Sequence, residues 1–226
     1  MEFYITPTTC IFSRFLKVSW YDSSEQDALN LQQEMSEEQK NSMQIVYDAK
    51  QIDRFKGQVV NGYLEISSDA SITSFGFVDH WKLTSLKIVD CPNLSLERAP
   101  KLLTSLTITE CGLKSTKGID KAKLLKHLSL RNNSLSDLED LDKLTALEEL
   151  DLSFNQLYQI DLVSALIKLK SLNLRRNNLI VVKPVEALKE LKSLEIDENM
   201  IQDLECVKQL DNFDWEMISQ QKAKRI

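Results

Sequence analysis

The strongest constraint on the fold of this chain is a motif, LxxLxLxxN, that recurs every 22 residues. Its four clearest copies begin at Leu125, Leu147, Leu169 and Leu191. Further copies begin at Leu103 and Leu83, the Leu83 unit being two residues shorter, and a weaker copy lies in "GYLEISSDASI". We count seven units between about residues 61 and 212. A fixed period of this length indicates stacked repeats that share one continuous core.

Each unit predicts a short strand that ends in a turn. In "LEELDLSFNQL", residues 147–157, Leu150 and Leu152 alternate with polar residues and therefore occupy the core face of a strand. Asn155 follows, and its amide both donates and accepts hydrogen bonds, so stacked copies can satisfy the backbone groups of successive turns. The predicted turn ladder consists of Cys91, Cys111, Asn133, Asn155, Asn177 and Asn199. Cysteine has only a weak S–H donor and is the poorer ladder residue.

The second half of each unit has a different spacing. After Leu135, apolar residues follow at Leu138, Leu141, Leu144 and Leu147, three positions apart each time. A 3₁₀ helix has three residues per turn and an α-helix 3.6, so this spacing predicts 3₁₀ or extended segments.

The pattern resembles the leucine-rich repeat family, in particular the 22-residue subclass typified by the nuclear regulatory subunit of protein phosphatase 1. The resemblance covers residues 61–212. It implies an α/β fold: a right-handed curved solenoid with a parallel sheet on its concave face, convex 3₁₀ or extended segments and an N-terminal capping helix. Known members of the subclass bind phosphatases, dynein chains, spliceosomal proteins or cell-surface receptors. The resemblance therefore implies protein binding without naming the partner.

The segments outside the repeats are expected to cap the solenoid, whose open ends would otherwise expose the core. Within residues 35–60, Ser36 and Gln39 have the spacing of a capping box, and apolar residues at helical spacing predict a helix over about 37–54. Residues 213–226 contain "FDWEMI", a predicted final strand, and a basic tail. Residues 1–34 form an N-terminal extension with a short predicted helix in "SEQDALNLQQEM". Docking on the cap, disorder and partner binding all stay open for this extension.

Composition excludes several functional classes. The net charge of −6 argues against a nucleic-acid binder. Four scattered cysteines and two histidines predict neither a zinc site nor a disulfide framework, and we expect no cofactor. No apolar run is long enough for a membrane helix, and the N-terminus lacks a signal-peptide pattern. No catalytic motif is present, so we expect that the protein is not an enzyme. We also expect it to be cytoplasmic and monomeric.

Function is therefore expected on the concave face. The predicted partner-binding residues are His127, Arg131, Asn132, Glu149, Asp151, Phe154, Asn173, Arg175, Arg176, Glu195, Asp197 and Glu198. Ser153 is expected to point outward with them. Three arginines surround Phe154 in this arrangement, and aromatic and arginine side chains are enriched among binding hot spots. We hypothesise that the patch grips an acidic or mixed-charge protein segment, with a phosphopeptide as a sharper variant.

Two local alternatives compete with this hypothesis. Phe154 can simply shield the turn, and the arginines can pair with Asp151, Asp197 and Glu198 across strands, each pair being worth about 0–1 kcal/mol. His127 is expected to make an ordinary cross-strand contact with Glu149. At the level of function, the alternatives to a general interaction module are a regulatory subunit of a protein phosphatase and a cytoskeletal or axonemal assembly subunit.

Overall fold

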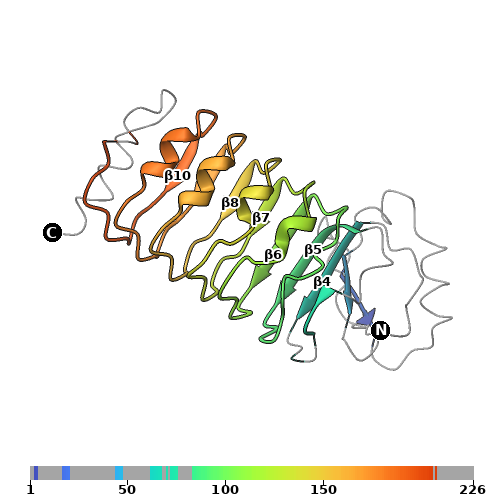
Figure 1. Cartoon of the computed structure of the whole chain (residues 1–226). Helices are drawn as coiled ribbons and strands as arrows, with labels where there is room; N and C mark the ends of the chain where they lie inside the picture. Colours follow the sequence, from blue (N-terminus) through green and yellow to red (C-terminus); the bar gives the residue numbers. More distant parts are fainter. Residues whose placement is uncertain are drawn as a thin grey trace.

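The repeats stack into a solenoid with one continuous sheet along one side (Figure 1). The structure is a computed structural model, and it describes residues 3–4, 17–20, 44–47, 62–67, 70, 72–75, 83–205 and 207. The strands within these ranges are β1 (Phe3–Tyr4), β2 (Lys17–Trp20), β3 (Gln44–Tyr47), β4 (Gly62–Ser67), β5 (Leu83–Val89), β6 (Ser105–Thr109), β7 (His127–Ser129), β8 (Glu149–Asp151), β9 (Ser171–Asn173) and β10 (Ser193–Glu195). They form a 10-stranded sheet in chain order. The seven strands β4–β10 coincide with the seven sequence units.

Equivalent residues of successive repeats lie beside one another in the sheet. Strands β2 to β10 pair in parallel, whereas β1 runs antiparallel to β2. Leu128 lies opposite Leu150, and Leu150 lies opposite Leu172. All three leucines are buried. The predicted parallel sheet with a leucine core face is thus confirmed, since a one-residue slip would turn these side chains out of the core.

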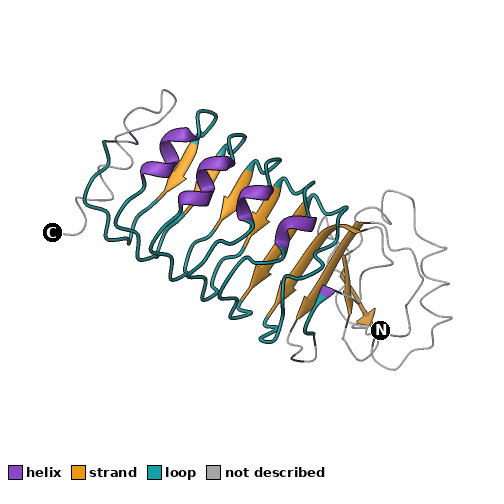
Figure 2. Ribbon diagram, viewed as in Figure 1, coloured by secondary structure: helices purple, strands orange, loops and turns teal. Residues whose placement is uncertain are grey.

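The side of the solenoid away from the sheet carries a row of short 3₁₀ helices (Figure 2). These helices are η3 (Ile119–Lys121), η4 (Leu141–Lys143), η5 (Asp161–Ala165) and η6 (Lys183–Ala187). The leucine spacing of three matches the hydrogen bonds, because the amides of Leu141, Leu144 and Leu147 each donate to the carbonyl three residues earlier, at 3.0 Å. The predicted 3₁₀ path is confirmed.

A ladder of asparagine side chains connects the turns of neighbouring repeats. Asn155 Oδ1 accepts from the amide of Leu135 at 2.9 Å, and its Nδ2 donates to the carbonyls of Leu130 and Leu152, both at 3.0 Å. The Leu152 carbonyl also accepts from Asn177 Nδ2 at 2.9 Å. Each rung therefore shares an acceptor with the next, and the side chains of Asn155 and Asn177 are buried.

At the first two positions of the ladder, cysteine replaces asparagine and makes weaker side-chain hydrogen bonds. The Cys91 amide donates to Cys111 Sγ at 3.3 Å, and this sulfur donates to the carbonyl of Thr109 at 3.2 Å. Neither thiol is in a disulfide, and both are buried. Hydrogen bonding with Cys91, followed by burial, raises the pKa of the Cys111 thiol, so this sulfur stays protonated in the folded chain.

One glycine is required by a close approach between repeats. Gly118 has φ 91° just before η3, and a Cβ at this position would lie 2.9 Å from the Cα of Glu97. The amide of Gly118 donates to Asp140 Oδ2 of the next repeat at 2.9 Å. Any larger residue would have to move one repeat away from the other.

The predicted N-terminal helix over 37–54 is wrong at its centre. Residues Gln44–Tyr47 form strand β3, which pairs in parallel with β4 on one side and β2 on the other. Ile45 and Val46 are β-branched and favour a strand. Pairing with β3 also satisfies the backbone groups that β4 would otherwise leave open at a sheet edge.

The other predictions for the ends of the chain are only partly covered by described residues. Strands β1 and β2 lie within the N-terminal extension of residues 1–34. The rest of the predicted cap in 35–60, the short helix in "SEQDALNLQQEM" and the final strand in "FDWEMI" fall outside the described residues.

Candidate functional site

The twelve predicted partner-binding residues lie on strands β7–β10 and in the turns that follow these strands. None of the twelve is buried. Strand register places His127 beside Glu149. A second row runs from Ser129 to Asp151, then to Asn173 and then to Glu195, each residue lying beside the next. Parallel strands lie about 4.8 Å apart, so these residues form rows across the repeats. The twelve side chains divide into two groups, one over the strands and one at the turns where the strands end.

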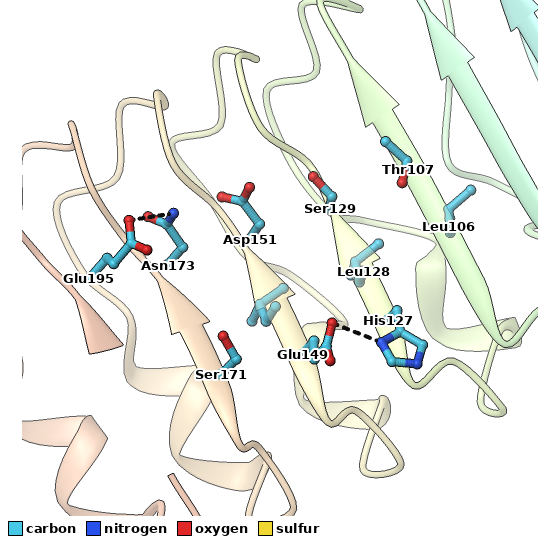
Figure 3. A pocket seen from close by; sticks show the side chains of 11 residues that line it. Leu106, Thr107, His127, Leu128, Ser129, Glu149, Asp151, Ser171, Asn173 and Glu195 are labelled. Atoms are coloured by element: carbon cyan, nitrogen blue, oxygen red, sulfur yellow. Dashed lines mark hydrogen bonds and ion pairs between the residues drawn. The ribbon is translucent and has the colours of Figure 1, made fainter. Parts of the chain in front are cut away.

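The first group lines a depression over β7–β10, which we call the acidic hollow. It has a volume of about 310 Å³ and is shown in Figure 3. Its polar lining includes His127, Ser129, Glu149, Asp151, Asn173 and Glu195. Leu128 and Leu150 also line it, but each is only 2% exposed, because their side chains belong to the core face. Sequence reasoning did not anticipate that five of the twelve residues would share one depression.

The carboxylates of the acidic hollow have uncharged or weakly basic neighbours. His127 Nδ1 lies 3.0 Å from Glu149 Oε2, the predicted cross-strand contact. Asn173 Nδ2 donates to Glu195 Oε2 at 3.0 Å, and both contacts are drawn in Figure 3. Asp151 Oδ1 accepts from the Ser153 amide at 2.9 Å, and no arginine among the described residues makes the ion pair with Asp151 that the sequence suggested. A carboxylate has about four acceptor positions, so each of these carboxylates can accept further hydrogen bonds.

The second group, the rim cluster, surrounds Phe154 at the ends of the strands. It consists of Arg131, Asn132, Phe154, Arg175, Arg176, Asp197 and Glu198. The guanidinium carbon of Arg131 lies 4.6 Å from the centre of the Phe154 ring, and that of Arg176 lies 5.0 Å from it. Both distances are within the range of cation–π attraction, worth about 0.5–1 kcal/mol at exposed sites. Phe154 is half-buried, so part of its ring faces solvent between two cations.

Two of the three rim arginines are paired with carboxylates of the next repeat. Arg175 Nε lies 2.9 Å from Asp197 Oδ2, and a second ion pair joins Arg175 to Glu198. Arg176 Nε lies 2.8 Å from Glu198 Oε2. The hydrogen bond to Glu198 and the charge of Asp197 raise the pKa of Arg175. Arg131 makes no ion pair among the described residues, so it is the rim cation left for an external carboxylate.

The backbone at the rim adopts a conformation that the sequence did not predict. The residue before each ladder position has positive φ: Asp90 (54°), Glu110 (59°), Asn132 (56°), Phe154 (57°), Arg176 (54°) and Glu198 (55°). This left-handed region costs most residues about 1–2 kcal/mol, and Asn and Asp tolerate it best. Phe154 is held there by its amide, which donates to the Arg175 carbonyl at 2.9 Å.

The expectation that Ser153 points outward is wrong. Its side chain is fully buried, and within the described region its hydroxyl oxygen has no hydrogen-bond partner. Strand β8 ends at Asp151, so the in–out alternation of a strand does not extend to Ser153, two residues later.

An exposed apolar surface lies on the other side of the turn, and sequence reasoning missed it. It comprises Tyr158, Ile180, Val181 and Met200, which are 62%, 48%, 58% and 51% exposed. The amides of Asn178 and Met200 donate to the carbonyls of Leu157 and Leu179, both at 2.9 Å, so these loops run side by side. The sequence did contain a signal for this surface, because Tyr158 and Ile180 occupy the same position after the ladder asparagine in adjacent repeats.

The described residues offer little for metal chemistry or membrane insertion. Within them, no group of three or more His, Cys, Asp or Glu side chains is placed to hold a metal ion. No helical segment of the described chain has the length and apolar character that crossing a bilayer requires.

Comparisons with known proteins agree with the repeat architecture. The family model "Leucine Rich repeats (2 copies)" matches residues 123–168. Internalin C2 of Listeria monocytogenes has a TM-score of 0.60 and 22% identity, over 66% of this chain and 67% of its own. A leucine-rich repeat protein of Leptospira interrogans has a TM-score of 0.63 and 26% identity, over 74% of this chain and 45% of its own. The comparison with curated proteins finds no match.

A third similar structure is TLR13 in its complex with ssRNA13, with a TM-score of 0.60 and 19% identity, over 79% of this chain and 33% of TLR13. Matches at identities this low show only the fold, which is a leucine-rich repeat solenoid. The 22-residue subclass is not singled out by these matches. Solenoids of this kind generally act as protein-interaction modules, because stacked repeats create an extended binding surface.

Proposed function

We propose that this protein is a non-catalytic interaction module that binds a protein segment on the open face of β7–β10. The observation that best supports this proposal is Phe154, a partly buried aromatic ring that lies between the guanidiniums of Arg131 and Arg176. Its backbone lies in the left-handed region, which disfavours a bulky residue. The equivalent positions in the other described repeats hold polar or charged residues, so Phe154 is the apolar exception among the six.

The rim cluster would supply the anchor and the acidic hollow the polar contacts of this interface. Phe154 offers apolar area, and Arg131 offers a guanidinium that can bind a carboxylate through two hydrogen bonds. The ion pairs of Arg175 and Arg176 would hold the neighbouring part of the rim in place rather than bind the partner. The proposed partner segment is therefore of mixed charge.

The test is affinity purification with mass spectrometry from the cells that make the protein, comparing wild type with Phe154→Asn and Arg131→Ala. Asn tolerates the left-handed backbone, so Phe154→Asn removes the ring without adding strain. We expect loss of the captured partner while the free energy of unfolding changes by less than about 1.5 kcal/mol. Tyr158→Ala is the matched control, because Tyr158 is an exposed aromatic on the other side of the turn.

Two results would contradict the proposal. One is a partner retained by Phe154→Asn and Arg131→Ala but lost by Tyr158→Ala, which would move the interface to the exposed apolar surface. The other is a loss of roughly 3 kcal/mol of stability in Phe154→Asn, the cost of truncating a fully buried Phe.

We further propose that the protein acts in the cytoplasm as a monomer. Cys91 and Cys111 are not joined in a disulfide, which is compatible with a reducing compartment. Cell fractionation tests the compartment, and light scattering after gel filtration tests for a mass of 26.0 kDa.

A further inference from the structure

The acidic hollow indicates the chemistry of the partner more closely than the rim does. It is a depression of about 310 Å³ in a sheet face that no other described segment covers. Its walls carry Glu149, Asp151 and Glu195, and no lysine or arginine is among its lining residues. Three carboxylates from β8 and β10 thus lie in one depression.

Among the described residues, no lysine or arginine makes an ion pair with these carboxylates, although the charge of Arg175 interacts with Glu195 and that of Lys170 with Glu149 at longer range. Arg175 and Arg176 turn to Asp197 and Glu198 at the rim. The guanidinium of Arg131 lies against Phe154. The basic group in contact with them is the His127 imidazole, whose Nδ1 lies 3.0 Å from Glu149 Oε2.

The charge of the hollow suits a basic side chain. The carboxylates of Glu149, Asp151 and Glu195 can accept hydrogen bonds from the charged end of a lysine or arginine. A carboxylate-bearing side chain would instead meet three like charges.

We infer that the acidic hollow receives a lysine or arginine side chain of the protein segment that binds the open face. This inference rests on the proposed function and specifies its partner: a segment with a basic residue over β7–β10. It also changes the emphasis of the sequence hypothesis, which assigned recognition to the arginines and hence to an acidic or phosphorylated segment.

The test is selection from a display library of random linear peptides on the whole protein, followed by fluorescence anisotropy with the selected peptides. We expect enrichment of Arg and Lys over Asp and Glu. Replacing the key Arg by citrulline, or acetylating the key Lys, removes the charge and retains the size, and should weaken binding by about tenfold or more. Added salt should weaken it further.

A matched pair of variants locates the site. Glu149→Gln with Asp151→Asn removes two charges from the hollow, and the amide oxygen of Asn can still accept from the Ser153 amide. Glu139→Gln with Asp142→Asn makes the same change in net charge among residues that pair with Lys117 and Lys143 outside the hollow. We expect about tenfold or greater loss of peptide binding in the first variant only.

The outcomes separate this inference from the proposed function. Enrichment of acidic peptides whose binding depends on Arg131 and Phe154 would overturn the inference and leave the proposed function standing. Equal weakening by both charge variants would also overturn it, because only net charge would then matter. Peptides that bind equally well to the hollow variant, Phe154→Asn and Arg131→Ala would overturn both.

Discussion

Replacing Asn155 by Ala should be among the most destabilising changes in the repeats that leave every leucine in place. The Asn155 side chain accepts from the buried Leu135 amide at 2.9 Å and donates to the carbonyls of Leu130 and Leu152 at 3.0 Å. Alanine leaves the Leu135 amide without its partner, at a cost of about 1–3 kcal/mol. Each carbonyl keeps a donor from Asn133 or Asn177, so each loses one ordinary bond of about 0.5–1.5 kcal/mol.

Together these losses lower the free energy of unfolding by about 4 kcal/mol. Urea denaturation followed by far-ultraviolet circular dichroism measures the change as a shift in midpoint at constant slope. Gln156→Ala is the control, since Gln156 has an exposed amide side chain next to Asn155 and should change stability by less than about 0.5 kcal/mol. If Asn155→Ala costs no more than Gln156→Ala, the ladder does not stabilise the stack and the reasoning fails.

Four further predictions follow from single contacts. Gly118→Ala should cost about 1–3 kcal/mol, because the residue has positive φ and a close backbone neighbour; a mutant that melts like wild type would contradict this. Ser153→Ala should be neutral or stabilising by up to about 1 kcal/mol in the same urea assay, since it removes a buried hydroxyl without a partner. Cys111 should resist iodoacetamide at pH 8 until urea unfolds the chain, because a raised thiol pKa favours the neutral form. The contribution of this thiol to stability is lost as pH rises above about 8.5. Rapid labelling of the folded protein would refute the raised pKa. The hydrogen bond from Lys170 lowers the pKa of Glu148, so this carboxylate stabilises the fold above about pH 4 and less as pH falls. Urea midpoints of wild type and Glu148→Gln should therefore converge at pH 3.

Local, repeating features of this protein were determined by the sequence alone. The spacing from Leu138 to Leu147 predicted the 3₁₀ segments, and Leu150 and Leu152 predicted the core face of each strand. Both predictions succeed because each repeat contacts mainly its neighbours, so one 22-residue pattern specifies its own surroundings. The same register predicted that His127 lies beside Glu149.

Only the tertiary structure decided how these side chains pair and where the pattern stops. Helical spacing around Met43 to Lys50 predicted a helix, but the edge of β4 needs hydrogen-bond partners and Gln44–Tyr47 supplies them as a strand. Strand alternation exposed Ser153, although the strand ends at Asp151 and the chain then turns into the core. Such choices depend on groups that are distant in sequence, and a local pattern carries no information about them.

The division of the open face is the clearest case. The sequence placed three arginines and several carboxylates together, and Coulomb attraction alone allows many pairings among them. The stacked backbone leaves Arg175 and Arg176 within reach of Asp197 and Glu198, and it holds Arg131 against Phe154. The carboxylates of Glu149, Asp151 and Glu195 are thereby left around a hollow without a lysine or arginine. Composition determined that the face is charged, and packing decided which of its charges remain for a partner.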